Sequence, residues 1–378
     1  MAAFRTPMRY LFALAVTCLG SSVLAQDTFT GVNRIVAVGD VHGDYAQFVT
    51  VLRQARVIDD KGRWTGGSTH LVQTGDLLDR GPDSRKVMDL LIALAPQAER
   101  AGGRVHSLTG NHEVMNVLGD LRYVHPGEYA AFRSDNAKAL QQRAFDVLSD
   151  STRRKDAAYK AQWFEQHPLG WVEHRMAFEA NGKYASWIRG NNAVVRINDW
   201  LFLHGGIGPK YVDTALRALN DGVRAALDPT RPPPEGNIAE DAEGPLWYRG
   251  LATGDEDSLA THVDRVLERF GVRHVAIGHS VSPGTIYPRF GGKVVMIDVG
   301  LSAAYEGPAA ALVIEDGRAR TLHRGQWLDL PLGGDVLPYL RAAAALDPQP
   351  SRLQPTIDRL AARVAPSSAT SERLTRPR

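Results

Sequence analysis

Residues that can bind metal ions or transfer protons are concentrated in five short motifs. They are GDVHGD (39–44), GDLLDRG (75–81), GNHE (110–113), LHGGIGP (203–209) and AIGHS (276–280). The first motif follows the apolar run 35–38, where burying Asp40, His42 and Asp44 without a compensating charge would be costly. A metal ion compensates such charges best. The other motifs must then supply further ligands.

Together the motifs offer carboxylate, amide and imidazole groups. The candidate metal ligands are Asp40, His42, Asp76, Asn111, His204 and His279. This mixture suits Mn, Fe or Zn, whereas ligands that are all oxygen atoms would suit Mg or Ca. Six ligands are too many for one tetrahedral ion, but they fit two divalent ions that share a carboxylate. Two such ions can clamp the attacking and leaving oxygens of an in-line phosphoryl displacement, so phosphoester hydrolysis is the predicted chemistry.

The elements that position these motifs alternate between short apolar runs and amphipathic segments, which is typical of an α/β layered fold. Strands are predicted over 33–38, 70–73 and 104–108, and helices over 44–55 and 84–100. Strand signals return at 193–197, 201–203, 273–277, 294–298 and 311–314, which favours a second sheet. Each of the first three strands ends in Gly and polar residues, at the edge where open α/β sheets place their sites.

Residues 114–192 interrupt this alternation. They are mainly helical in pattern and polar, with eight prominent aromatic residues, and they are too long for a simple connection. We therefore expect a helical insertion that lies over the site, with most of its aromatic residues used in packing. Residues 228–245 are rich in Pro and acids and predict a loop. The segment 346–378 predicts a flexible tail, apart from a short helix near 357–364.

The first 25 residues have the composition of a secretory signal. Arg5 and Arg9 precede an apolar stretch from Tyr10 to Leu19, and Val23-Leu24-Ala25 has the form of a signal-peptidase site. The stretch is shorter than the roughly 20 residues that span a bilayer, so we expect cleavage after Ala25 rather than an anchor. The predicted organisation is a signal peptide (1–25), one catalytic domain (26–345) and the tail. The protein is then exported, to a periplasm or out of the cell.

The charge balance excludes several classes of partner. Removing residues 1–25, which hold two arginines and no acids, leaves 42 basic and 42 acidic residues. A neutral protein is not expected to coat nucleic acid or to bind a membrane surface. The single cysteine, Cys18, lies in the predicted signal, so the mature chain has no disulfide and no thiol chemistry. The sequence leaves the oligomeric state open.

The order and spacing of the motifs resemble those of the calcineurin-like metallophosphoesterases, and GDLLDRG with GNHE resembles the phosphoprotein phosphatases among them. The similarity continues through GNHEVMNVLGDLRYV (110–124) and GPLWYRG (244–250), which resemble the Shewanella-like phosphatases. It covers about residues 33–316. The resemblance implies a two-sheet β-sandwich flanked by helices, and a phosphomonoesterase that acts on phosphoproteins or small phosphoesters, with two metal ions. Among these ions, we expect Mn to support activity in vitro.

The resemblance also implies a role for each motif residue. Asp40, His42 and Asp76 would hold the first ion, and Asp76, Asn111, His204 and His279 the second. A hydroxide that bridges the two ions would attack phosphorus. His112 would protonate the leaving oxygen and Asp79 would orient it, while Arg80, with Asn111, would bind the phosphate. Arg249, in GPLWYRG, is the candidate for a second phosphate-binding arginine.

Other interpretations stay open at this point. The same centre could hydrolyse a nucleotide, a dinucleoside polyphosphate or a phosphodiester, since the motifs address only the phosphoryl group. A non-catalytic phosphopeptide-binding protein would need a lost ligand, acid or arginine, and none is missing. Arg249 could instead stack on Trp247 or Tyr248. Three further residues could either line the site or form salt bridges: Arg122, Arg189 and Asp298.

Overall fold

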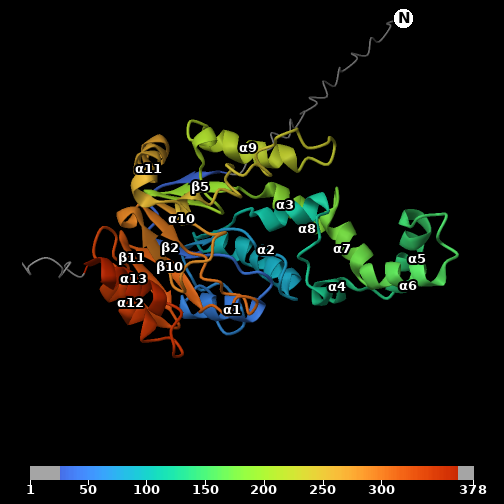
Figure 1. Ribbon diagram of the computed structural model, residues 1–378, viewed down its shortest axis with the longest axis horizontal. Helices are drawn as coiled ribbons and strands as arrows, with labels where there is room; N and C mark the ends of the chain where they lie inside the picture. The colour runs from blue at the N-terminus through green and yellow to red at the C-terminus, as the bar shows by residue number, and fades with distance from the viewer. Residues whose placement is uncertain (1–25, 365–378) are drawn as a thin grey trace, which may run out of the picture.

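The first sheet is built around three parallel strands in the computed structural model, which describes residues 26–364. These strands are β2 (Arg34–Val38), β3 (His70–Gln73) and β4 (Arg104–Ser107). The connecting helices, α1 (Tyr45–Gln54) and α2 (Ser84–Arg100), form where the apolar periodicity predicts them (Figure 1). Residues 35–37 are fully buried, as expected for parallel strands that are covered on both faces.

Three antiparallel strands complete this sheet. They are β10 (Ala310–Glu315), β11 (Arg318–His323) and β12 (Gln326–Asp329), in the order β12-β11-β10-β2-β3-β4. The sequence groups 311–314 with the strands of the second sheet, and this expectation is wrong, because β10 pairs with β2. The physical reason is that this apolar run needs cover on both faces, and the place beside the buried β2 provides it.

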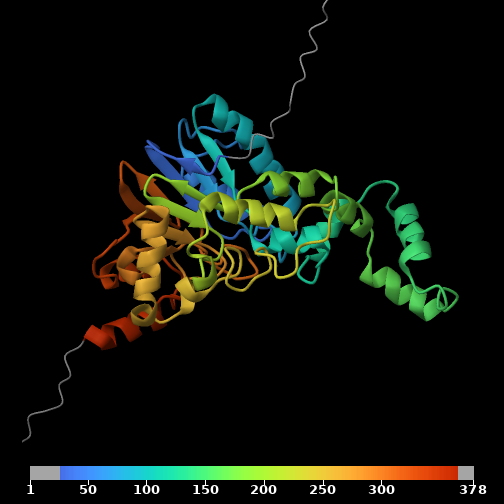
Figure 2. The ribbon, with the colours of Figure 1, turned by 90° about the horizontal axis from the view of Figure 1, so that it is seen from above.

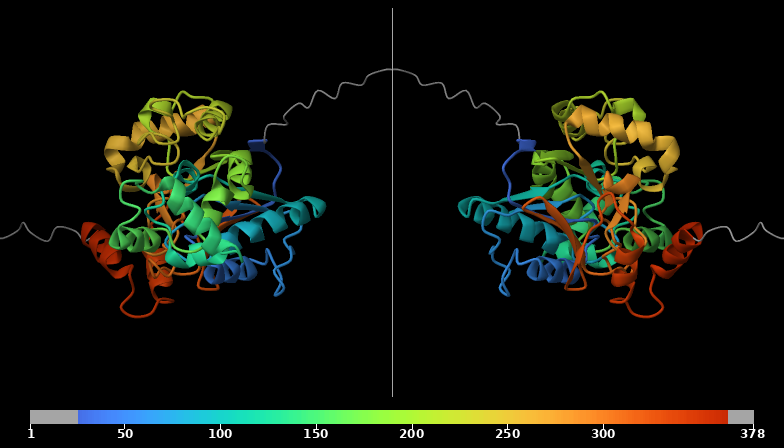
Figure 3. Two further views of the ribbon diagram at one scale, coloured as in Figure 1. Left: turned by 90° about the vertical axis from the view of Figure 1, so that its right-hand side faces the viewer. Right: turned by 90° about the vertical axis from the view of Figure 1, so that its left-hand side faces the viewer.

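The second sheet confirms the later strand predictions. Its order is β1 (Thr28–Phe29), β5 (Val194–Ile197), β6 (Trp200–Leu203), β7 (His274–Ile277), β9 (Val294–Met296) and β8 (Tyr287–Arg289). Its helices are α9 (Leu216–Ala226), α10 (Gly250–Thr253) and α11 (Glu256–Phe270), with short 3-10 turns at Pro209–Tyr211 and Phe290–Gly292. One continuous hydrophobic core joins the two sheets, and helices lie on both outer sides (Figure 3). Residues 228–245 form a loop, as predicted.

The region 114–192 is helical, as the sequence indicates. It contains most of α3 (Asn111–Leu118), then α4 (Pro126–Phe132), α5 (Ala137–Leu148), α6 (Ala157–Gln166), α7 (Trp171–Phe178) and α8 (Lys183–Gly190). Helices α5 and α6 project to one side of the sheets (Figure 2), around a small aromatic core of Phe145 and Trp163. The base of the region contacts the motif residues through Asn116 and Tyr123. That the insertion covers the site stays a prediction.

The packed structure continues past the boundary expected at residue 345. Helix α12 (Leu337–Ala344) is followed by α13 (Gln354–Val364), and Leu353 and Ile357 are buried between them and the body. The flexible tail is therefore wrong for residues 346–356, because these two apolar side chains are buried against the fold, whereas the short helix predicted near 357–364 is confirmed by α13. The signal peptide (1–25) and the segment 365–378 lie outside the described residues. Between 26 and 364, no helix combines the length and apolar character that crossing a membrane requires.

Candidate active site

The predicted metal ligands follow the carboxyl ends of strands from both sheets. Asp40 and His42 follow β2, Asp76 follows β3, Asn111 begins α3 after β4, His204 follows β6, and His279 follows β7. All six residues are at most 7% exposed. The backbone N–H of His279 donates to both oxygens of Asp40 at 3.1 Å, although the two residues are 239 positions apart. The fold therefore brings together every ligand that the motifs suggest.

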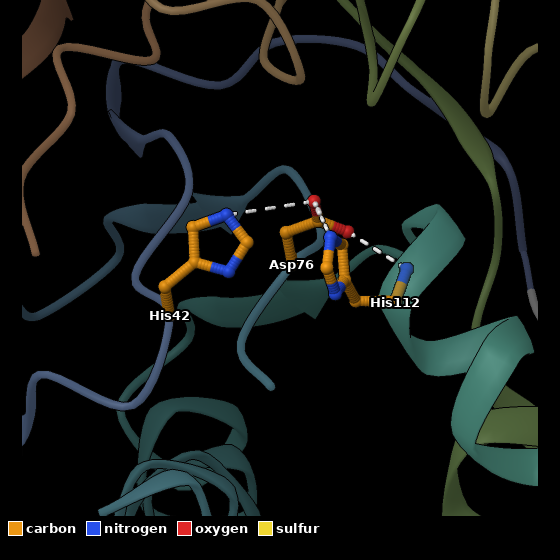
Figure 4. Close-up of side chains that lie close together, drawn as sticks. All are labelled: His42, Asp76 and His112. Atoms are coloured by element: carbon orange, nitrogen blue, oxygen red, sulfur yellow. Dashed lines mark hydrogen bonds and ion pairs between the residues drawn. The ribbon is translucent and has the colours of Figure 1, made fainter. Parts of the chain in front are cut away.

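Asp76 faces His42 and His112 (Figure 4) and also lies close to His204. Its Oδ2 is 3.8 Å from His42 Nε2 and 3.7 Å from His112 Nε2, and its Oδ1 is 3.2 Å from His204 Nε2. Burial opposes ionisation of this carboxyl group, but the surrounding imidazoles outweigh burial and hold the pKa of Asp76 well below its ordinary value. Asp76 is therefore an anion that faces three histidines.

Two of these histidines turn lone pairs toward oxygen atoms. His42 Nδ1 donates to the carbonyl of Leu78 at 2.9 Å, and His204 Nδ1 donates to the carbonyl of Thr74 at 3.0 Å. Burial lowers the pKa of His42 to about 4, so its ring is neutral and its Nε2 carries a lone pair that faces Asp76. His204 Nε2 likewise faces an oxygen atom, Asn111 Oδ1, at 2.8 Å. Lone pairs directed at one another need a cation between them.

A second set of groups in the cluster also lacks a counter-charge. His279 Nε2 is buried without a hydrogen-bond partner among the described residues, and burial lowers the pKa of His279 to about 2. Burial, together with the nearby charges of Asp298 and Asp76, raises the pKa of Asp40 well above its ordinary value. Burial also raises the pKa of Asp298 to about 6. A site that holds unpartnered imidazole nitrogen and crowded carboxylates fits bound cations.

The ligand atoms form two groups of the size that an ion requires. His42, Asp76 and His112 make one group, and Asp76, His204 and His279 make the other, with the atoms of each group within 4.8 Å of one another. The first group contains His112 where the sequence predicts Asp40, whose Oδ2 lies 4.0 Å from His42 Nε2. Asp76 belongs to both groups, as a carboxylate shared by two ions would. The residues present therefore fit a centre with two metal ions, and the donors suit Mn, Fe or Zn.

His112 and Asp79 form a buried pair beside this cluster. His112 Nδ1 lies 2.5 Å from Asp79 Oδ2, which leaves His112 Nε2 facing the centre of the site. Burial lowers the pKa of His112, but the carboxylates of Asp76 and Asp79 raise it by more, so the net shift of the pKa is upward. A raised pKa suits a side chain that must carry a proton.

Arg80 lies between two aromatic rings at the edge of the site. Its guanidinium carbon is 4.7 Å from the ring centre of Tyr123 and 5.3 Å from that of Tyr305. The buried Nε of Arg80 has no hydrogen-bond partner in the part of the chain that the structure describes. The tyrosines thus hold a planar donor whose N–H groups suit a phosphate.

Arg249 contacts the loop that carries His279. Its Nη1 donates to the carbonyl of His279 at 2.7 Å and to Ser280 Oγ at 2.9 Å, and Arg249 also precedes α10 as its N-cap residue. Arg249 therefore lies beside the predicted ligands and supports their backbone. Its role in phosphate binding stays a prediction.

The backbone around the site adopts an uncommon conformation. His42, Asp76, Asp79, Arg80 and His279 have φ values between 45° and 68°, in the left-handed region that non-glycine residues rarely occupy. Such conformations persist only where the surrounding structure enforces them, and they concentrate at functional sites. These turns at the strand ends direct the side chains of the motif residues toward the cluster around Asp76.

Sequence reasoning missed three residues that support the site. Tyr305 packs against Arg80, with its ring centre 5.3 Å from the guanidinium carbon. Glu113 accepts backbone N–H bonds from Gly110 (2.7 Å), Asp76 (2.8 Å) and Leu77 (2.9 Å), so it joins two of the motifs. Asn116 donates to Asp79. The available signal was helical spacing, because Asn116 stands four residues after His112 on α3 and shares its face.

Arg122, Arg189 and Asp298 could each line the site or form a salt bridge, and the structure answers differently for each. Arg122 is paired with Asp120 on the surface, and Arg189 is hydrogen-bonded to the carbonyl of Ala180. Asp298 is buried near Asp40, and its Oδ1 accepts from the backbone of Gly300 at 2.8 Å. Asp298 therefore belongs to the wall of the site. Arg122 lies at its edge, with the guanidinium carbon 5.7 Å from the ring centre of Tyr123, and Arg189 makes local contacts elsewhere.

The geometry defines a metal-dependent phosphoesterase, and comparison with known proteins agrees. The family model for calcineurin-like phosphoesterases matches residues 33–283, and the chain belongs to this family. It is a phosphatase with candidate metal-binding residues.

Three similar proteins narrow the comparison within this family. Shewanella-like protein phosphatase 2 of Arabidopsis thaliana is 30% identical over 74% of this chain and 74% of its own length. An uncharacterized protein of Schizosaccharomyces pombe is 33% identical, over 78% of this chain and 82% of its own. The crystal structure of the cold-active protein-tyrosine phosphatase of a psychrophilic Shewanella species is 29% identical, with a TM-score of 0.62, covering 81% of this chain and 83% of that one.

Proposed function

We propose that this protein hydrolyses phosphate monoesters on phosphorylated proteins or peptides. The observation that carries the proposal is Asp76, one carboxylate that faces two groups of metal-competent side chains. Asp40, His42 and Asp76 would hold one ion, and Asp76, Asn111, His204 and His279 the other. When bound, two such cations lower the pKa of a water molecule and neutralise charge on the phosphoryl group.

The remaining side chains have roles that follow from their positions. Arg80, held between two tyrosines, would bind the phosphoryl oxygens, and Arg249 would be the second arginine there. His112 would donate a proton from Nε2 to the leaving oxygen, because its Nδ1 is engaged by Asp79. In-line attack needs no covalent phosphoenzyme. Mn is the ion that we expect to support turnover.

The substrate class is supported by similarity to named phosphatases. One similar protein is a Shewanella-like protein phosphatase and another is a protein-tyrosine phosphatase. Arg80 and its tyrosines address only the phosphoryl end of a substrate, so they are compatible with phosphotyrosine, phosphoserine and phosphothreonine. Nucleotides, dinucleoside polyphosphates and phosphodiesters are the competing substrates.

Turnover assays with defined metals test this function. The purified protein, stripped of metal and reloaded with Mn, Zn or Fe, is compared on p-nitrophenyl phosphate, bis-p-nitrophenyl phosphate, diadenosine tetraphosphate and a panel of phosphopeptides. We expect the monoester and phosphopeptides to be hydrolysed faster than the diester and the dinucleotide. Faster hydrolysis of either competitor would contradict the proposed substrate class, and metal-independent turnover would contradict the mechanism.

We also propose that the protein is exported. Residues 1–25, which lie outside the described part, have the composition of a cleaved signal. N-terminal sequencing of protein from the fraction outside the cytoplasm should start at Gln26. An intact N-terminus on protein from the cytoplasm would contradict export.

A further inference from the structure

Asn116 connects the two residues of the His112–Asp79 pair. It is fully buried on α3, and its Nδ2 donates to Asp79 Oδ1 at 2.9 Å and to the backbone carbonyl of His112 at 3.0 Å. Asp79 Oδ2 is the oxygen that contacts His112 Nδ1. Both carboxylate oxygens of Asp79 are therefore engaged, one by the imidazole and one by the amide.

The orientation of the Asn116 amide is fixed by these partners. Asp79 Oδ1 and the His112 carbonyl can only accept hydrogen bonds, so a flipped amide would place oxygen against two oxygens. In the present orientation Asn116 Oδ1 is buried without a partner among residues 26–364. An unpartnered buried acceptor is costly. The amide keeps this orientation because its Nδ2 contacts outweigh that cost.

We propose that Asn116 is a positioning residue for proton transfer. By holding Asp79, it would keep His112 Nδ1 bonded and His112 Nε2 directed at the leaving oxygen. Asp79 needs such support because its own backbone is in the left-handed region, with a φ of 68°. This inference rests on the proposed role of His112 as proton donor.

The proton transfer determines what the test must measure. An oxygen of water forms a new bond to phosphorus, the bond from phosphorus to the leaving oxygen breaks, and its electron pair moves to that oxygen. The leaving oxygen takes the proton from His112 Nε2. The attacking water releases one proton to solvent, and His112 Nε2 takes up one proton from solvent before the next turnover. A strongly basic leaving oxygen needs this proton, whereas p-nitrophenolate leaves with little help. A defect in positioning therefore grows with the basicity of the leaving group.

The experiment compares two aryl phosphates in four variants. Asn116→Leu keeps the number and branching of the side-chain heavy atoms but removes the donor, and Asn116→Ser keeps a shorter donor. His112→Asn removes the proton donor, and Arg80→Lys weakens phosphate binding, which both substrates share. kcat is measured for p-nitrophenyl phosphate and for phenyl phosphate, with metal content and thermal unfolding recorded for each variant.

We expect Asn116→Leu to lower kcat about tenfold on phenyl phosphate and less than about threefold on p-nitrophenyl phosphate. Asn116→Ser should fall between Asn116→Leu and the natural protein. Arg80→Lys should lower both rates by the same factor. Equal losses on both substrates in Asn116→Leu and Asn116→Ser, with a selective loss in His112→Asn, would overturn the role of Asn116 alone. Equal losses in His112→Asn would overturn the proton donor itself, and this inference with it.

Discussion

Histidines within the parallel strands β3 and β4 and histidines beyond their carboxyl ends lie in opposite electrical settings. Beyond the carboxyl ends, His112 faces Asp76 and Asp79, which raise its pKa in spite of burial. Within the strands, His106 Nε2 lies 3.0 Å from His70 Nδ1, beside Arg104. There burial and neighbouring positive charge lower the pKa of His70 to about 4 and the pKa of His106 well below its ordinary value.

The difference teaches that burial alone does not make a functional site. Burial opposes the charge of an imidazole in both places. The carboxylates beside His112 outweigh burial there, whereas the positive charge of Arg104 adds to burial at His70 and His106. The carboxyl ends supply anions from separate loops, which then require cations. Within the strands, His70 and His106 have only imidazole and guanidinium groups as charged neighbours, and these groups keep both histidines neutral.

The largest effect is expected from removing the charge of Asp76, the carboxylate that belongs to both metal groups. Asp76→Asn should lower kcat/KM for p-nitrophenyl phosphate by at least about 10³-fold, because both metal groups lose a charged ligand. Elemental analysis should show the loss of bound metal. Asp329→Asn, at an exposed position on β12, is the control and should leave both quantities unchanged. An active, metal-free Asp76→Asn protein would refute the assignment.

A second test weakens the hydrogen bonds between Glu113 and the backbone around Asp76. Glu113→Gln replaces a carboxylate that accepts three backbone N–H bonds with an amide that can accept through only one atom. The free energy of unfolding should fall by about 2–3 kcal/mol, measured by urea titration. Glu315→Gln, which breaks partly exposed ion pairs with Arg34 and Arg320, should cost less than about 1 kcal/mol. Similar losses in the two variants would argue against a special role for Glu113.

A pH titration tests the lowered pKa values of the two histidines within the strands, His70 and His106. The unfolded chain binds protons on His70 and His106 near their ordinary pKa of about 6.5, whereas the folded chain does not until the pH falls much lower. Their contribution to stability is thus complete above pH 6.5 and is lost as the pH falls from about 6.5 toward about 4. The midpoint of urea unfolding should decline less over this range in His106→Gln. A decline equal to that of the natural protein would show that these histidines titrate normally.

The smallest expected effect concerns support from the insertion. Arg175 on α7 donates from Nη1 to the backbone carbonyl of Asn116 at 2.7 Å. Arg175→Ala should lower kcat by less than about threefold, because Asn116 keeps its own bonds to Asp79 and His112. Arg154→Ala, near the tip of the insertion, is the control for a general effect on these helices. A loss as large as that of Asn116→Leu would mean that α7 itself sets the geometry of the pair.

Sequence patterns predicted much of the first sheet and the candidate metal ligands. The apolar runs before Gly-Asp and Gly-Asn placed β2, β3 and β4 within a residue at each end, and helix α2 has the predicted bounds. The six predicted ligands converge because the strand ends of both sheets meet there. Their residue types suffice because metal chemistry restricts the choice of ligands.

Other parts depended on contacts that no local pattern contains. The place of β10 beside β2 is decided by pairing across the chain, and the burial of Leu353 and Ile357 by a surface formed elsewhere. Glu113 was quoted within GNHE, yet its three backbone bonds come from turns that only the fold brings near. Asp298 was ambiguous because its neighbour Asp40 is remote in sequence.

The pairing of β10 with β2 has a consequence for the order of synthesis. The strand that presents Asp40 and His42 is made early, but its partner on one side emerges from the ribosome only after residue 315. His279, which holds Asp40 through its backbone, also comes late. Long-range pairing of this kind is slow and forms after most of the chain exists. The nascent polypeptide therefore passes through most of translation without a completed centre for catalysis.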